Sequence, residues 1–284
     1  MDFAQIFKGI NCKGDEKYLE VFKPLKPLII ERITTYLNGR NTRHIGRPMT
    51  TNLDLLLDAL FFVVESGSQI RYVKRYFGIP KTTFNRYVKI IIEQHILLDT
   101  YNEAIKNCLM TDLMITDTFT VKSMRGSEGL GRNPTDRGRK GLKVSLITDV
   151  NRVTRTAFIG SANTHDTKLL LKTLEQIPQP EIIVTCLCDS GYVGKKLRDT
   201  CRKKNFRLIV KPRRTRKKGR MTHLLLKQDA TLLQKNRNQI ELLNGHIRRF
   251  RGLMIKWVRN ISTYECFLYV ALLCITCYQL FVNQ

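Results

Sequence analysis

The stretch EIIVTCLCDSGY, residues 181–192, decides how the second part of the chain folds. Its first eight residues form a nearly continuous apolar run that ends at Asp189, as is typical of a strand buried on both faces of a sheet. Open α/β sheets place their chemistry at the carboxyl ends of such strands, beside a tight turn. We therefore interpret Asp189 as a candidate catalytic residue on a central strand.

The segments on either side of this strand predict an α/β domain. Upstream, runs rich in Val, Ile, Thr and Phe predict a three-stranded meander at 113–122, 142–150 and 154–161. A predicted helix at 166–176 then leads into the 181–189 strand. Downstream we expect a helix at 193–204, a strand at 206–211, a long helix from about 224 to 251 and an apolar C-terminal helix. The order β-β-β-α-β-α-β-α is that of the ribonuclease-H-like fold.

The sequence of residues 1–110 predicts a separate, all-α region. A helix at 53–65 follows the N-cap candidate Asn52, a short helix at 70–77 ends at Gly78, and Pro80 opens a third helix. Between about 52 and 95 this is a helix-turn-helix pattern. The last helix carries side chains that suit phosphate and base-edge contacts, namely Lys81, Thr82, Asn85 and Arg86. The alternative is a packing module whose polar face is merely solvated.

The charge of the chain points to a polyanionic partner. The formal net charge is +25; residues 1–110 carry 16 basic and 11 acidic side chains, whereas residues 111–284 carry 33 and 13. Nucleic acid is the leading candidate to neutralise such a surplus. The most concentrated basic run lies near 211–220 and contains Arg213, Arg214, Arg216, Lys217 and Lys218. We expect it to bind phosphate; a solvated loop and a nuclear address match the composition as well.

Several features favour an intracellular chain. The start, MDFAQIFKGI, lacks the pattern of a secretory signal, so the eight Cys should stay reduced. The apolar run 266–282 predicts a buried core helix, with a membrane anchor as the alternative. The spacing of neither Cys pair, 186/188 or 274/277, is enough to predict a zinc site. The single Trp257 is expected to be a packing residue.

Three acidic residues stand out among the 13 that follow residue 110. Asp117 sits inside the first strand of the meander, where an unpaired carboxylate needs a partner or a metal, and Asp189 ends the central strand. Glu241 lies in the long helix on the same face as Arg237 and Arg248. Together the three acids could hold divalent ions; alternatively, Glu241 forms only a salt bridge with Arg237 along its helix. By contrast, we expect Asp166 to cap a helix and the neighbouring His165 to be structural.

Residues 113–281 resemble the insertion-sequence transposases of the DDE type, in the subgroup whose third acid lies in a Tyr-Arg-Glu-Lys signature. The similarity rests on TDTFTVK, KGLKVSLITD, GSANTHD, CDSGY, RNQIE and RRFRGL, which occur in the family's order. Asp117 and Asp189 are 72 residues apart, and Asp189 and Glu241 are 52 apart. The signature is incomplete, since Gln234 replaces its Tyr and Arg248 its Lys.

The resemblance implies a DNA transposase with a catalytic domain at 111–284. Asp117, Asp189 and Glu241 would bind two Mg²⁺ or Mn²⁺ ions, and Arg237 and Arg248 would hold DNA phosphates. The partners would be double-stranded element ends and target DNA, and the active form a homodimer or higher multimer in the bacterial cytoplasm, or in the nucleus of a eukaryotic or viral host. A domesticated, catalytically weak DNA-binding protein and a simple metal-dependent nuclease remain as alternatives.

Overall fold

The computed structural model describes residues 2–282, apart from 11, 13, 15, 40–50, 109–110, 127, 135 and 214–224. By packing, the chain divides into two units. The first contains Met1–Cys108, Ser123–Glu128 and His246–Gln284, and the second contains Leu109–Lys122 and Gly129–Gly245. This division differs from a single boundary near residue 110, because the C-terminal segment packs with the N-terminal helices.

The sheet of the second unit has the strand arrangement that the sequence predicts. Its order is β2-β3-β1-β5-β6, with β4 also paired to β3. The strands are β1 (Leu113–Ser123), β2 (Gly131–Arg132), β3 (Lys140–Asp149), β4 (Thr154–Ser161), β5 (Val184–Cys188) and β6 (Phe206–Val210). The meander β1-β3-β4 is antiparallel, whereas β5 runs parallel to both β1 and β6. The short β2 was not predicted.

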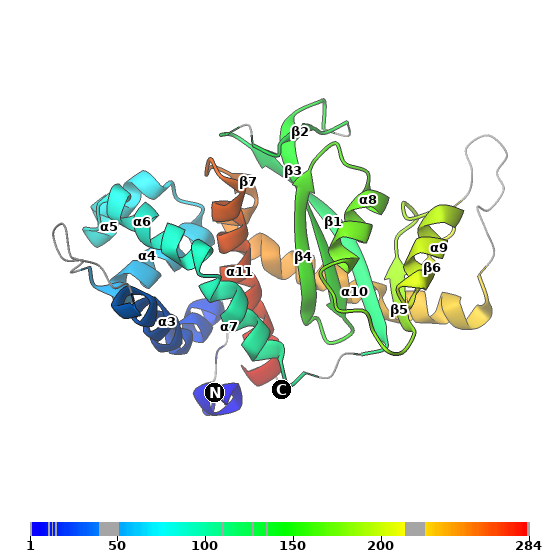
Figure 1. Ribbon diagram of the computed structural model, residues 1–284, viewed down its shortest axis with the longest axis horizontal. Coiled ribbons are helices and arrows are strands. Elements are labelled where there is room, and N and C mark those ends of the chain that lie inside the picture. Colours follow the sequence, from blue (N-terminus) through cyan, green and yellow to red (C-terminus); the bar gives the residue numbers. More distant parts are fainter. Residues whose placement is uncertain are drawn as a thin grey trace. The chain divides into compact units, whose positions relative to one another are not determined.

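Helices cover both faces of this sheet (Figure 1). On one face, α8 (Asp166–Leu174) and α9 (Lys195–Lys203) bury Leu170 and Leu197 against Met114 and Cys186. On the other face, α10 (Lys227–Arg249) buries Ile240 against Ile115 of β1 and Leu187 of β5. Successive strand residues point to opposite faces, so β1 and β5 contribute to both cores, as a two-sided apolar pattern predicts.

The first unit is helical and built around α11 (Ile261–Cys277), which continues as the π-helical turn η4 (Tyr278–Val282). Its other elements are α1 (Phe3–Ile6), α2 (Lys17–Phe22), η1 (Lys23–Leu25), α3 (Lys26–Gly39), α4 (Leu53–Ser66), η2 (Ile70–Tyr72), α5 (Val73–Phe77), α6 (Lys81–Glu93), α7 (Ile96–Ile105), η3 (Arg251–Leu253) and β7 (Ile255–Lys256).

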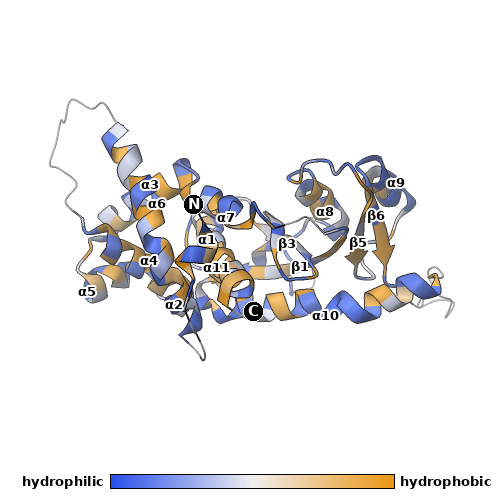
Figure 2. Cartoon of the chain, turned by 90° about the horizontal axis from the view of Figure 1, so that it is seen from below, coloured by the Kyte–Doolittle hydropathy of each residue, from blue (hydrophilic) through white to orange (hydrophobic). Residues whose placement is uncertain are grey.

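Helix α11 behaves as a core helix. Among the described residues, Ile261–Val282 is the one helical stretch long and apolar enough to cross a membrane. Its apolar residues, whose ribbon is coloured orange in Figure 2, are nevertheless largely buried, and it packs against α2, α4, α6 and α7. Burial of this surface by the N-terminal helices is what draws the C-terminal segment into the first unit.

The helices that were predicted to form a helix-turn-helix are present. The Asn52 side chain accepts a hydrogen bond from the Leu55 amide at 3.1 Å and caps α4, and Gly67 ends that helix in a left-handed conformation. Gly78 ends α5 in the same way, and α6 begins directly after Pro80. The sequence thus marks these helix ends correctly through residues whose backbone or side chain terminates a helix.

Two local predictions were wrong. Residues 181–183 are not part of β5, and Ile182 and Ile183 are 60% and 66% exposed. Asp166 does not cap α8; His165 does so, through a bond that its ring nitrogen accepts from the Thr167 amide. Asp166 instead occupies the first turn of the helix, where its carboxylate is free to bond elsewhere.

Candidate active site

Asp117 is held on β1 by hydrogen bonds to both of its carboxylate oxygens. The Thr118 amide donates to Oδ1 at 2.8 Å, and the Asn244 side-chain amide, on α10, donates to Oδ2 at 2.9 Å. Burial raises the pKa of Asp117 above its ordinary value; the two hydrogen bonds oppose this, and the charges of Asp189 and Asp166 raise the pKa further. The carboxylate is therefore one that a cation would stabilise.

Asp189 and Glu241 line the same cavity as Asp117 within the second unit. The cavity has a volume of about 510 Å³. Asp189 follows the carboxyl end of β5, as predicted, and is exposed. Glu241 projects from α10 with 59% of its side chain exposed. The structure thus brings all three predicted acids to one cavity, from two strands and a helix.

Positive side chains line this cavity beside the acids. Lys211, directly after β6, and Arg237, on α10, both line it, as does Gln234 at the position of the missing signature tyrosine. Arg237 Nε lies 3.3 Å from Glu241 Oε1, which is the salt bridge considered as the alternative to metal binding. The helical spacing of four residues brings the two together.

The carboxylates of Asp117, Asp189 and Glu241 suit divalent ions once the Glu241 side chain has moved away from Arg237. Within the part of the chain that the structure describes, no three His, Cys, Asp or Glu side chains already form a metal-binding group. Asp117 and Asp189 interact unfavourably as like charges, which a divalent cation would relieve. Glu241 would have to leave Arg237, but an exposed ion pair of this spacing contributes only about 0.3–0.5 kcal/mol.

Asp166 is a residue whose place near the site the sequence did not reveal. Lys143 Nζ, on β3, lies 2.8 Å from Asp166 Oδ1, and Thr118 Oγ1 donates to the same oxygen at 3.1 Å. Thr118 is the residue whose amide bonds Asp117. Asp166 thus supports β1 next to Asp117. In the sequence, the only indication of this role was that an acidic residue follows His165.

The predicted DNA-binding residues fall in different places. In the first unit, Lys81, Thr82, Asn85 and Arg86 are exposed on α6, and Arg248 lines another cavity with Tyr18. In the second, Arg237 lines the acidic cavity, and Arg213 is exposed just after β6. The remaining members of the basic run, Arg214, Arg216, Lys217 and Lys218, lie outside the described residues.

The cysteines belong to the packing of the two units. Cys186 and Cys188 lie in the core of the second unit with Cys201, and burial raises the pKa of Cys201 to about 12. Cys274 and Cys277 are buried in α11. All four of these cysteines are buried and pack as apolar core residues.

Comparison with known proteins identifies the family. Residues 111–277 match the family described as Transposase DDE domain, and the chain belongs to it. A protein of Burkholderia cepacia, assigned as the transposase for insertion sequence element IS402, is 27% identical over 172 residues, which cover 56% of this chain and 74% of that protein. The cavity with its three acids lies wholly inside the matched region.

The fold has a match among solved structures. A piggyBac transposase synaptic complex with hairpin DNA is similar at a TM-score of 0.53 and 10% identity, covering 93% of this chain and 74% of that one. At this identity the likeness concerns the fold alone. With the sheet order described above, it establishes a ribonuclease-H-like transposase fold with a helical N-terminal region.

Proposed function

We propose that this chain is a DNA transposase that cuts the phosphodiester backbone at element ends and joins the freed 3′-hydroxyls to target DNA. The observation that supports this most is the meeting of Asp117, Asp189 and Glu241 at one cavity inside the family match. In hydrolysis, water attacks phosphorus and the bond to the 3′ oxygen breaks. In joining, that 3′ oxygen attacks a target phosphodiester and displaces another 3′ oxygen.

Asp117, Asp189 and Glu241 would hold two Mg²⁺ or Mn²⁺ ions. When bound, such ions supply charge stabilisation for the attacking and leaving oxygens of an in-line displacement. Asn244 keeps Asp117 oriented by its bond to Oδ2, and the Thr118 amide fixes the other oxygen. These bonds favour the ionised form of Asp117, which is the form that binds a cation.

The basic side chains would bind DNA. Lys211 and Arg237 stand beside the acids and suit the phosphates on either side of the cut, and Arg248 suits a more distant phosphate. Helix α6 would give sequence preference through Asn85 and Arg86 as the second helix of a helix-turn-helix. Paired element ends would require a homodimer or higher multimer, acting in the bacterial cytoplasm or in a nucleus.

A second candidate is a catalytically weak, domesticated DNA-binding protein. It is favoured by the pairing of Glu241 with Arg237, which leaves only two acids ready to bind a cation. A nuclease that cuts without joining would use the same three acids. The charge of +25 suits all three functions.

A cleavage assay distinguishes these functions. The substrate is a labelled duplex from the DNA that flanks the coding region, incubated with Mg²⁺, Mn²⁺ or EDTA. We expect Asp189→Asn to abolish nicking while DNA affinity stays at least as high, since one repulsive charge is lost. The matched control is Asp199→Asn, an exposed acid on α9, which should nick normally.

Each other outcome has a clear meaning. Nicking that survives in Asp189→Asn contradicts the assignment of the triad. A wild-type chain that binds the duplex but never nicks it supports the domesticated binder. Nicking without joining of a pre-cut end to a target plasmid supports the simple nuclease.

A further inference from the structure

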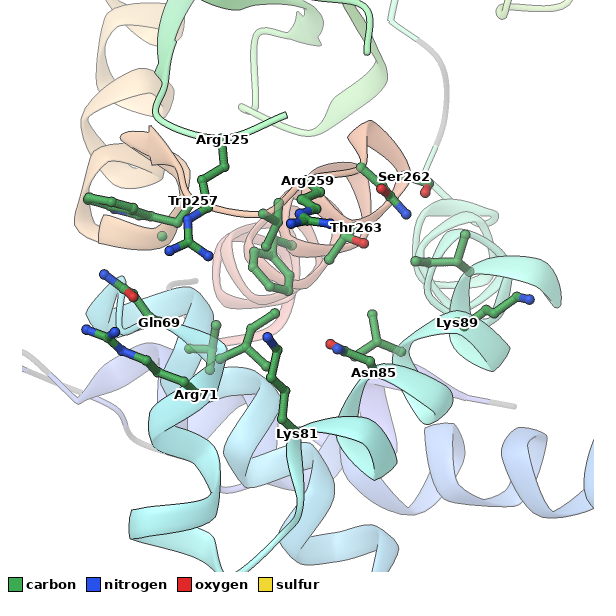
Figure 3. A pocket seen from close by; sticks show the side chains of 18 of the residues that line it. Gln69, Arg71, Lys81, Asn85, Lys89, Arg125, Trp257, Arg259, Ser262 and Thr263 are labelled. Carbon is green, nitrogen blue, oxygen red and sulfur yellow. The ribbon is translucent and has the colours of Figure 1, made fainter. Parts of the chain in front are cut away.

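A second large cavity, of about 680 Å³, lies within the first unit (Figure 3). One wall is α6, with Lys81 and Asn85. Another is the segment that follows α4, with Gln69 and Arg71. Opposite them stand Arg125, together with Trp257 and Arg259 of the segment before α11, and Ser262 and Thr263 in the first turn of α11. None of these residues belongs to the acidic site of the second unit.

The charges lining this cavity are strongly unbalanced. Five basic side chains line it against one acid, Glu93, and Lys89 already pairs with that acid at 3.4 Å. For Lys81, Arg125 and Arg259 the described residues provide no salt-bridge partner. In Figure 3 Arg125 and Arg259 point into the cavity from one side and Lys81 from the other. Converging cations without a counter-charge repel one another, so the cavity favours an anion.

The wall that carries the two arginines is built around a buried lysine. Lys256 is fully buried, and its ammonium donates to the carbonyl oxygens of Arg125, Val258 and Arg259 at 3.0, 2.8 and 2.8 Å. Gly126 completes the junction: a Cβ there would lie 2.5 Å from the Arg259 carbonyl oxygen. The backbone of both arginines is therefore fixed before any ligand arrives, which reduces the entropy lost on binding.

The remaining lining suits a base. Trp257 is partly exposed and lines the cavity, so it is not solely the packing residue expected from the sequence. Gln69 and Asn260 also line the cavity and offer amide donors and acceptors. A volume of about 680 Å³ is in the range that encloses a single small ligand, roughly 300–1,000 Å³, and does not admit a duplex.

We propose that this cavity binds one unpaired nucleotide of a DNA strand, with its phosphate at Lys81, Arg125 and Arg259 and its base stacked on Trp257. The choice of DNA rests on the proposed function; the anion and the aromatic contact rest on the cavity itself. Stacking on an aromatic ring is tolerant of sequence, so any base fits.

Trp257 provides its own test, because it is the only tryptophan in the chain. The full-length protein is titrated with a 12-nucleotide oligo-dT strand and with an abasic strand of equal length and charge, following Trp257 fluorescence and strand anisotropy. We expect oligo-dT to quench the fluorescence and to bind about 5- to 150-fold more tightly than the abasic strand. Equal quenching by both strands, or none by either, would overturn the stacking.

Paired variants test the phosphate contacts. Arg125→Ala/Arg259→Ala removes two charges from the cavity, and Lys74→Ala/Arg75→Ala removes two exposed charges from α5 outside it. We expect only the first pair to reduce the slope of log affinity against log salt, by about 0.7 for each lost contact. Equal slopes for the two pairs, with unchanged melting temperatures, would overturn the anion site.

Nicking by the same preparations separates this inference from the proposed function. A protein that nicks element-end duplex but shows no oligo-dT quenching refutes only the nucleotide cavity. A protein that quenches with oligo-dT but never nicks refutes only the catalytic proposal.

Discussion

Removing the carboxylate of Asp149 should destabilise the sheet that carries Asp117. Asp149 ends β3 and is only 1% exposed; in the β1–β3 ladder it lies opposite Met114. One of its oxygens accepts from the Asn151 and Val153 amides at 2.9 and 3.0 Å, and the other pairs with Arg155 at 2.8 Å. The Arg155 side chain is 9% exposed, so both charges are largely withdrawn from water.

The burial of this pair sets the size of the effect. Breaking a buried ion pair by removing one partner costs about 3–5 kcal/mol, because the remaining charge stays buried alone. At about 2–4 °C per kcal/mol, Asp149→Ala should lower the melting temperature by about 6–20 °C. In Asp149→Ala/Arg155→Met no charge is left unpaired, so the cost should fall to about 1–2 kcal/mol for the amides that lose an acceptor.

Thermal unfolding and urea unfolding, both followed by circular dichroism, measure the changes in melting temperature and in the free energy of unfolding. The control is Asp136→Ala, since Asp136 and Arg139 are 3.8 Å apart and their side chains are 43% and 51% exposed. That exposed pair should contribute about 1 kcal/mol or less. Equal losses for Asp149→Ala and Asp136→Ala would refute the argument from burial. So would a double variant as unstable as the single one, because the unpaired arginine would then not be the cause.

Two further predictions concern the active site. Because the pKa of Asp117 is raised, the folded chain holds this proton more tightly than the unfolded chain, and its stability falls as pH rises through the folded pKa. In EDTA, Asp117→Asn should therefore melt higher than wild type at pH 8, with the difference vanishing below about pH 4; an equal difference at both pH values would contradict this. Asp166→Asn weakens the pair with Lys143, whose side chain is 16% exposed, and should lower stability by about 1–2 kcal/mol in thermal melts, whereas Asp199→Asn should not.

The sequence was sufficient for elements whose pattern is local. The meander, the central strand and the helices α4 to α6 follow from side-chain periodicity and from caps such as Asn52 and Gly78. Asp117 and Asp189 were singled out for a related reason, whereas Glu241 was singled out by the helix face that it shares with Arg237 and Arg248 and by the family resemblance. A carboxylate inside an apolar strand, or at its end, is unfavourable in those surroundings, and such a residue can be recognised from the sequence alone.

What the sequence could not give are contacts between distant elements. Asn244 bonds Asp117 across 127 residues, and no pattern in α10 distinguishes it from other polar positions. Lys256 lies in an ordinary basic segment of the sequence, yet its side chain is fully buried and donates hydrogen bonds to three carbonyl oxygens. The placement of the C-terminal segment was missed for the same reason, since apolarity predicts that α11 is buried but not by which helices.

Glu241 and Arg237 connect metal binding with DNA binding in the proposed transposase. While Glu241 pairs with Arg237, the arginine is partly neutralised, and the Glu241 carboxylate lines the cavity without being available to a cation. If Glu241 turns toward a cation, Arg237 is released as a full positive charge beside the scissile phosphate. Phosphate that binds Arg237 likewise frees Glu241. Each ligand therefore favours the state that binds the other, and this coupling must be equal in both directions. Because the exposed pair itself contributes only about 0.3–0.5 kcal/mol, it biases the site without blocking it.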